Sequence, residues 1–129
     1  MQHRLLADYL ASIEHALSEL SGAYIESYVE EILTSERANL RVRLRFADNR
    51  LLEINEAVAV EADALVSLGY RYHCQDGRNQ LIFRYDDTPH FPGLSSFPHH
   101  KHLPDGVIAV EKPTVSEVLK ESREGFGSD

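Results

Sequence analysis

Apolar residues in the first twenty positions recur at intervals of three and four, which is the spacing of an amphipathic helix. They are Leu5, Leu6, Tyr9, Leu10, Ile13, Ala16, Leu17 and Leu20. Asp8, Glu14 and Glu19 fall on the opposite face of the same pattern. The pattern ends at Ser21-Gly22, where the glycine suits a helix C-terminus. The sequence therefore predicts an amphipathic helix over about residues 5–20.

After this helix the hydrophobic period changes from about 3.6 to 2. Residues 24–33 are rich in β-branched and aromatic side chains and predict a strand, in spite of the Glu30-Glu31 pair. Residues 40–46 alternate between arginine and apolar side chains, a pattern typical of a half-buried strand. Asp48-Asn49 predicts a tight hairpin turn, and residues 51–60 form its second strand.

The alternation resumes after a connecting stretch expected at residues 61–68. Residues 70–74 predict another strand, Asp76-Gly77 a turn, and residues 80–85 the last strand. Strands joined by short turns pair with their sequence neighbours. We therefore expect a meander of about five mostly antiparallel strands.

Residues 87–106 contain four prolines and predict an irregular loop; the prolines are Pro89, Pro92, Pro98 and Pro104. Thr114 and Glu117 have the spacing of a capping box, which opens a short helix through about Glu124. Residues 125–129 read as a frayed tail. The expected fold class is α+β, in one domain spanning residues 1–124.

Composition limits the classes of function. The chain of 129 residues has a single cysteine, so no intrachain disulfide can form and a reducing, cytoplasmic location is expected. No apolar run approaches the roughly 20 residues that span a membrane. The net charge of −8 argues against nonspecific coating of nucleic acid. Residues 39–86, with seven arginines and seven acids, are neutral, so a local anion site remains compatible with the charge.

The segment from Asp86 to His102 concentrates groups that move protons or bind metal near neutral pH. Its candidate catalytic residues are Asp86, His90, His99, His100, Lys101 and His102. Two imidazoles would serve as general base and general acid on an RNA 2′-hydroxyl and the leaving oxygen. Lys101 and Arg84 would stabilise the phosphate charge, and Asp86 would orient a histidine. Alternatively, any one of these histidines simply bonds the loop backbone.

The same segment also permits a metal site, although its spacing is not a zinc signature. His100 and His102 are two residues apart, so extended backbone points both to one side. Asp86, Asp87 or His90 would complete the ligand set for a divalent metal. No other cofactor is predicted.

A second candidate surface lies on the predicted sheet. Arg41, Arg43 and Arg45 share one face of their strand, and Arg71, His73 and Arg84 join them if the meander pairs as expected. Such a face would bind phosphate through bidentate guanidinium contacts. The ordinary alternative, favoured by sequence alone, is a solvated face whose arginines pair with acids such as Glu53.

Residues 70–119 resemble the TumE-like proteins, small products of bacterial and archaeal toxin–antitoxin operons. The resemblance rests on Tyr-Arg-Tyr-His (70–73), Phe-Arg-Tyr-Asp (83–86), Pro-His (89–90) and Phe-Pro-His-His-Lys-His (97–102). The chain departs from the family pattern at Asp87-Thr88, where Asn-Ala is common, and at Phe91, where a second histidine is usual. The resemblance implies a toxin whose partner is a small antitoxin, commonly a helix-turn-helix DNA-binding protein.

Three functions follow as hypotheses. The first is a toxin that cleaves RNA through the histidine-rich segment and the arginine-bearing sheet face. The second is a noncatalytic interaction module whose loop docks through Phe91, Leu94 and Phe97, with the histidines as polar rim. The third is a metal-dependent hydrolase. A homo-oligomer is compatible with each of them.

Overall fold

The computed structural model describes residues 1–124, and the tail expected at residues 125–129 lies outside them. The elements in chain order are α1 (Arg4–Ser18), β1 (Ala23–Thr34), β2 (Arg37–Phe46), β3 (Leu51–Glu61), β4 (Ala64–Gln75), β5 (Leu81–Asp86), β6 (His100–Leu103), β7 (Gly106–Ala109) and α2 (Val115–Glu124). The strands form a single sheet in the order β1 to β7, with every neighbouring pair antiparallel. The predicted α+β class and antiparallel meander are confirmed.

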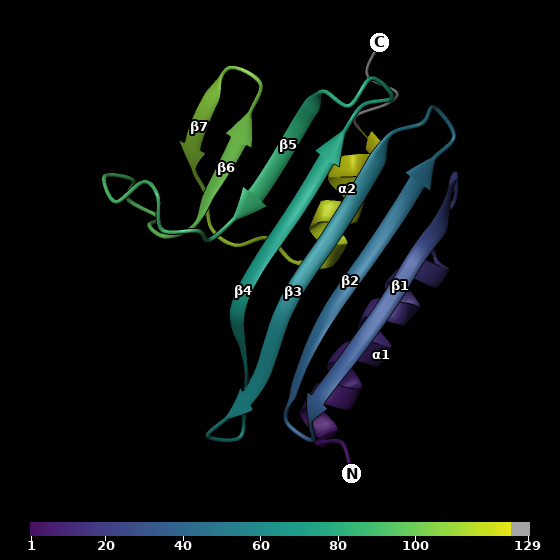
Figure 1. Ribbon diagram of the computed structural model, residues 1–129, viewed down its shortest axis with the longest axis vertical. Helices are drawn as coiled ribbons and strands as arrows, with labels where there is room; N and C mark the ends of the chain where they lie inside the picture. Colours follow the sequence, from purple (N-terminus) through teal and green to yellow (C-terminus); the bar gives the residue numbers. More distant parts are fainter. Residues whose placement is uncertain (125–129) are drawn as a thin grey trace.

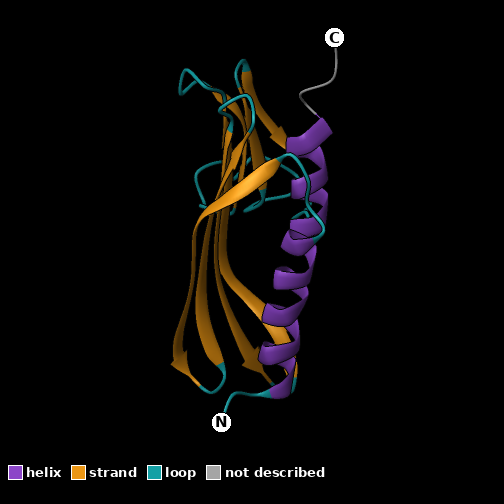
Figure 2. Ribbon diagram, turned by 90° about the vertical axis from the view of Figure 1, so that its right-hand side faces the viewer, coloured by secondary structure: helices purple, strands orange, loops and turns teal. Residues whose placement is uncertain are grey.

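The molecule has two layers. Figure 1 shows the sheet in front of both helices, and Figure 2 shows α1 and α2 along the same side of the sheet. Helix α1 buries Leu6, Leu10, Ile13 and Leu17, which is the apolar stripe expected from the sequence. The helix ends at Ser18, slightly before the end of the periodic pattern, with Glu19 as its C-cap.

The number of strands predicted from the sequence, about five, is wrong: the described chain forms seven. Residues 87–106 were expected to be an irregular loop throughout, but β6 and β7 lie within and just beyond that segment. Strand β6 reads His-Lys-His-Leu and is four residues long, so it carries neither clear alternation nor β-branched residues. It pairs with β5 only after the chain closes the loop of residues 87–99.

The expected connection at residues 61–68 is also wrong, because β3 and β4 run straight through it as a hairpin. Only Ala62 and Asp63 separate the two strands, and both have positive φ, 52° and 60°. Positive φ at both central residues is the conformation of a type I′ turn. The usual Asn-Gly signal is missing from Ala-Asp, so the turn could not be seen in the sequence.

Helix α2 begins as the capping box predicts. The Glu117 N–H donates to Thr114 Oγ1 at 3.1 Å, and the Thr114 N–H donates to Glu117 Oε1 at 2.8 Å. The hydrogen bonds that the N–H and the hydroxyl of Thr114 donate to the Glu117 carboxylate lower the pKa of that carboxyl. No helix of residues 1–124 is long and apolar enough to cross a membrane.

The two faces of the sheet differ in chemistry. The face toward the helices carries the core, including Leu44, Ile54 and Tyr72. Within it the carboxylate of Glu56 accepts hydrogen bonds from the hydroxyls of Tyr9 on α1 and Tyr72 on β4. The opposite face carries the polar side chains of each strand, and the candidate functional residues divide between these two faces.

Candidate functional site

Strand register gathers several candidate residues on the face opposite the helices. Directly paired residues in antiparallel strands point to the same side of the sheet. Asp86 pairs with His100 on β6 and with Arg71 on β4. Arg84 pairs in the same way with His102 and His73. The histidines of β6 therefore share the face of Arg71 and Arg84.

Three side chains meet at the junction of β5 and β6, and we call Asp86, His100 and His102 the histidine–aspartate cluster. His100 Nε2 lies 2.9 Å from Asp86 Oδ1 and 3.1 Å from His102 Nε2. His102 Nε2 lies 3.5 Å from Asp86 Oδ2. The three ligand atoms all fall within 4.8 Å of one another. The cluster thus has the composition and the closeness of a metal-binding or acid–base centre.

Backbone groups orient two members of the cluster. His100 Nδ1 donates to the carbonyl oxygen of Pro98 at 2.9 Å, because a carbonyl can only accept. The Thr88 N–H donates to Asp86 Oδ1 at 3.0 Å. The ring of Phe91 packs edge-on against His100 and His102, at centroid distances of 4.9 and 5.9 Å. The cluster is therefore held on several sides by the loop of residues 87–99.

Solvent reaches the cluster from the side of His102. The side chains of His100 and Asp86 are 2% and 7% exposed, whereas that of His102 is 25% exposed. Burial lowers the pKa of His102, and His100, Arg84 and His90 add to that effect against the opposing charge of Asp86. His102 is the member of the cluster that a substrate in solution can meet directly.

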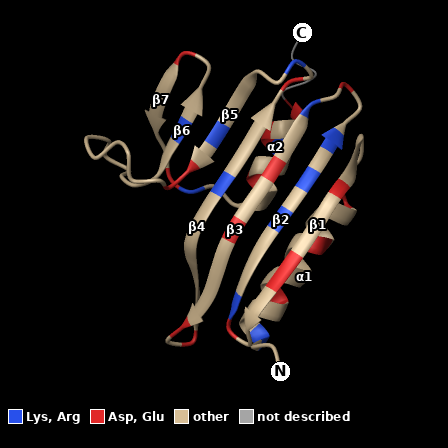
Figure 3. Cartoon of the chain, viewed as in Figure 1, with Lys and Arg blue, Asp and Glu red and all other residues tan. Residues whose placement is uncertain are grey.

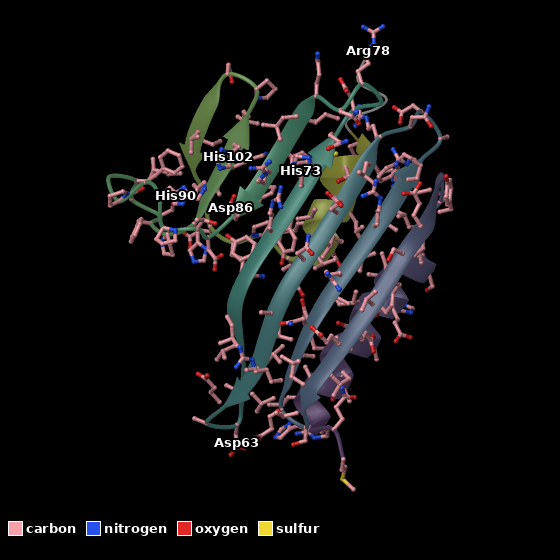
Figure 4. All side chains as sticks on the ribbon, in the orientation of Figure 1. Asp63, His73, Arg78, Asp86, His90 and His102 are labelled. Atoms are coloured by element: carbon pink, nitrogen blue, oxygen red, sulfur yellow. The ribbon has the colours of Figure 1, made fainter. Side chains whose placement is uncertain are left out.

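His90 lies on the loop at the edge of the site. Figure 4 shows it gathered with Asp86 and His102 where the loop meets β5 and β6. Its side chain is exposed, so it is free to approach a bound substrate. It is not among the atoms that converge in the cluster.

His73 and Arg84 extend the polar site along the sheet. Arg84 Nε donates to His73 Nδ1 at 3.2 Å, and His73 Nε2 is 2.8 Å from Gln75 Oε1. Burial lowers the pKa of His73, and the neighbouring charges of Arg84 and Arg71 lower it further. His73 is therefore a neutral group that fixes the guanidinium of Arg84 beside His102.

Figure 3 shows basic positions along β2 next to acidic positions on β1 and β3, and Arg41, Arg43 and Arg45 differ in their ion pairs. Arg43 pairs with Glu26 and Glu53, and Arg45 pairs with Glu26, all at 2.9–3.0 Å. This is the cross-strand pairing that the ordinary interpretation of the arginine face expected. Arg41, by contrast, makes no ion pair with any residue of the described chain.

An open cavity of ≈ 470 Å³ lies on the sheet beside the cluster. Arg41, Asn55 and Arg71 line it, and Arg71 is the residue paired with Asp86. Like Arg41, Arg71 forms no ion pair within residues 1–124. Two guanidinium groups that form no ion pair within residues 1–124 thus border a recess that Glu31 and Glu56 also line and that adjoins the cluster.

Three other candidate residues lie away from the cluster. Lys101 points to the helix face, where its Nζ is 2.6 Å from Glu121 Oε2 on α2. His99 Nδ1 is hydrogen-bonded to the hydroxyl of Tyr70 at 2.9 Å, and the two rings stack. Asp87 Oδ1 accepts from the N–H of Tyr70 at 3.2 Å.

Sequence reasoning missed Asn55 in the recess and the Pro98 carbonyl beside the cluster, and it considered Phe91 only as a docking anchor and not as a neighbour of the two histidines. Asn55 is a polar residue at an alternating position of β3, and this signal could have placed it on the arginine face. No local signal marks the Pro98 carbonyl, because its role depends on where the loop of residues 87–99 brings His100.

The fold and the site define a small α+β protein with an open sheet. One face of the sheet is covered by helices, and the other carries a histidine–aspartate cluster beside Arg41 and Arg71, whose guanidinium groups form no ion pair within residues 1–124. Residues 13–125 match the family described as Toxin TumE, and the chain belongs to that family. It is thus a toxin of the kind found in toxin–antitoxin systems, which implies an antitoxin as its partner. Comparison with curated proteins and with solved structures gave no match.

Proposed function

We propose that this toxin cleaves RNA at the histidine–aspartate cluster. The observation that carries the proposal is the meeting of one carboxylate and two imidazoles on the same sheet face as Arg71 and Arg84. Cleavage of a phosphodiester requires a group that generates the nucleophile and cations that stabilise the charge on the phosphate. This face supplies both kinds of group.

The phosphate would bind between the cluster and the guanidinium of Arg84. The bond from Arg84 Nε to His73 fixes this guanidinium, and the strand register sets it opposite His102. Arg71 and Arg41 would hold further phosphates over the recess, where Asn55 offers an amide for the ribose or base. Arg43 forms ion pairs with Glu26 and Glu53, and Arg45 forms one with Glu26. Both arginines would therefore contribute to the substrate site only by balancing charge.

The nucleophile could arise in two ways. An imidazole could remove a proton from a 2′-hydroxyl, in which case a partner acid protonates the leaving oxygen. Because His100 is buried, that role would fall to His102, with exposed His90 as the second group. Alternatively, a cation held by the cluster would activate water. The two schemes differ in their response to a chelator.

Growth after induced expression tests the proposal in cells. We expect the intact chain to arrest growth and His102→Ala to abolish the arrest, while His99→Ala, which alters a loop residue hydrogen-bonded to Tyr70 outside the cluster, retains it. Protein levels and circular dichroism of each variant control for folding. Full arrest by folded His102→Ala would overturn the catalytic role of the cluster.

Cleavage of total RNA by the purified chain tests the substrate. The intact chain and His99→Ala should cut RNA, and His102→Ala and Arg84→Ala should lose at least about a hundredfold in rate, since general acid–base groups contribute that much. The docking alternative is favoured by the exposure of Phe97, 44%, on the loop. It predicts instead that Phe97→Ala abolishes toxicity and that His102→Gln is fully toxic.

For the partner, we propose a small helix-turn-helix antitoxin with a basic surface. The charge of the toxin supports this choice, since residues 1–38 carry two arginines against seven acids. These acids belong mainly to α1 and β1, at the opposite end of the sheet from β6. Co-purification of the two proteins, weakened as salt is raised, is the expected result.

A further inference from the structure

We infer that the histidine–aspartate cluster binds one divalent first-row transition metal ion, with Zn²⁺ the ion best suited to its donors. The inference deepens the proposed function, on whose site it rests. The ligands would be Asp86 through a carboxylate oxygen, and His100 and His102 each through Nε2. Two imidazoles and one carboxylate form a common ligand set of catalytic zinc and of non-haem iron.

The tautomer of His100 is the first reason. Its Nδ1 carries a proton because it donates to the carbonyl of Pro98. In the neutral ring, Nε2 then presents a lone pair to Asp86 Oδ1 at 2.9 Å and to His102 Nε2 at 3.1 Å. Electron-rich atoms so close together need a positive charge among them, and a metal ion satisfies all three at once.

The spacing of the donor atoms is the second reason. Zn–N and Zn–O bonds of about 2.0–2.1 Å set the ligand atoms of a tetrahedral site roughly 3.4 Å apart, and those of an octahedral site roughly 3.0 Å apart. His100 Nε2 lies 2.9 Å from Asp86 Oδ1, His102 Nε2 lies 3.5 Å from Asp86 Oδ2, and the two Nε2 atoms are 3.1 Å apart. These separations are close to the two values, so a metal ion would fit between the two imidazoles and the carboxylate group, whose two oxygens each face one histidine.

The surroundings resemble the outer shell of a metal site. Metal-bound histidine usually donates its other N–H to a carbonyl or carboxylate, as His100 does to Pro98. Asp86 Oδ1 is likewise fixed by the N–H of Thr88. Phe91 excludes water from one side, and the remaining coordination positions open toward solvent past His102. An open position of this kind distinguishes a catalytic metal site from a structural one.

The bound ion has a direct consequence for the proposed reaction. Coordination to zinc lowers the pKa of water to about 7, so hydroxide is available as a nucleophile at neutral pH. Its oxygen would form the new bond to phosphorus while the bond from phosphorus to the leaving ribose oxygen breaks. The leaving oxygen then takes up a proton, for which exposed His90 is the nearby donor.

Titration of the chelator-treated full chain with ZnCl₂ in a calorimeter tests the inference independently of any RNA. We expect one ion per chain, and absorption bands of a low-symmetry site when Co²⁺ is used instead. His102→Ala and Asp86→Asn should weaken Zn²⁺ binding by more than about a hundredfold, since even outer-shell changes cost ten- to a hundredfold. His99→Ala is the matched control and should bind as the intact chain does. His102→Ala alters the most exposed ligand, so it keeps the test informative if Asp86→Asn does not fold.

The metal site would be overturned if the intact chain did not bind Zn²⁺ stoichiometrically, or if folded His102→Ala bound Zn²⁺ equally well. The proposed function fails separately. RNA cleavage that persists in excess chelator without bound metal would refute a part for the metal ion in the reaction and leave RNA cleavage standing. Conversely, one ion bound in a His102-dependent way without RNA cleavage would support the metal site and refute the substrate.

Discussion

At the scale of single residues, His73 is held in its neutral form by its neighbours. Its Nδ1 accepts from Arg84 and its Nε2 donates to Gln75, an arrangement that a doubly protonated ring cannot make. Burial, together with the charges of Arg84 and Arg71, lowers its pKa below the ordinary value of 6.5. Protonation of His73 would release Arg84 from its fixed position beside His102.

This environment predicts a pH dependence of stability. Between the lowered pKa of folded His73 and 6.5, the unfolded chain binds more protons than the folded chain does. The folded chain therefore keeps its full stability, as far as His73 is concerned, above pH 6.5. It loses stability as the pH falls from 6.5 through the lowered pKa of His73. Urea unfolding at pH 7.5 and at pH 5.5 should show a smaller loss of stability in His73→Gln than in the intact chain. His15→Gln, altered at an exposed position of α1, is the control, and the same pH dependence in both variants would contradict the assignment.

At the scale of elements, β6 separates two groups of residues that adjoin in sequence. His100 and His102 face the polar side, whereas Lys101 between them faces α2 and lies over the rings of Phe83 and Tyr85. Although burial by itself lowers the pKa of Lys101, hydrogen bonds to Glu121 and Tyr85 outweigh it and the net shift is upward. Lys101 therefore attaches β6 to α2.

Replacement of Lys101 tests this division. Lys101→Met should lower the free energy of unfolding by on the order of 1 kcal/mol, since a partly buried ion pair is lost. RNA cleavage and zinc binding by the folded fraction should be unchanged. Arg4→Met, which breaks an exposed pair with Asp8, should leave both stability and activity as they are. Loss of cleavage in a Lys101→Met variant that is stable and folded would instead indicate that Lys101 takes part in the reaction.

The limits of sequence reasoning also appear at this scale. Strands β2, β3 and β5 were predictable because their alternation is local, as in residues 40–46. The capped start of α2 was visible for the same reason. Strand β6 was not, because four residues between Pro98 and Pro104 carry too little pattern and their partner lies beyond the loop of residues 87–99.

The candidate site was predictable in composition but not in arrangement. Grouping Asp86 with His100 and His102 needs only their nearness in sequence. Excluding Lys101 from the cluster needs the register of β6, which decides the face of each side chain, and excluding His99 needs the loop conformation that brings its ring to Tyr70. Likewise, only the pairing of Arg43 with Glu26 and Glu53 distinguishes it from Arg41.

At the scale of the whole molecule, the two faces of the sheet carry different groups of residues. Helices α1 and α2 and the core occupy one face, and the cluster, the recess and the free guanidinium groups occupy the other. The acid-rich strand β1 and the cluster-bearing strand β6 lie near opposite ends of the strand order. An antitoxin on β1 and a substrate on β5 and β6 could therefore bind to separate parts of one molecule.

The order of strands along the chain also determines when during protein synthesis the proposed active centre can form. A ribosome that has joined residues 1–86 has made Asp86 and Arg84 but neither histidine of the cluster. Even a chain ending at Ala109 lacks α2, whose buried Val115, Val118 and Leu119 contribute roughly 5–8 kcal/mol, as much as many domains have in total. We therefore expect unfinished copies to lack the activity proposed for the cluster.

Genetic selection would reveal this timing. Among cells that survive expression of the toxin, stop codons should be recovered along the gene as far as the codon of Glu121, whereas missense changes should concentrate at the cluster. A chain stopped at position 112 that still arrests growth would contradict the expectation. Translation of the mRNA therefore delays the proposed activity, because the strand that completes the cluster is among the last to be translated.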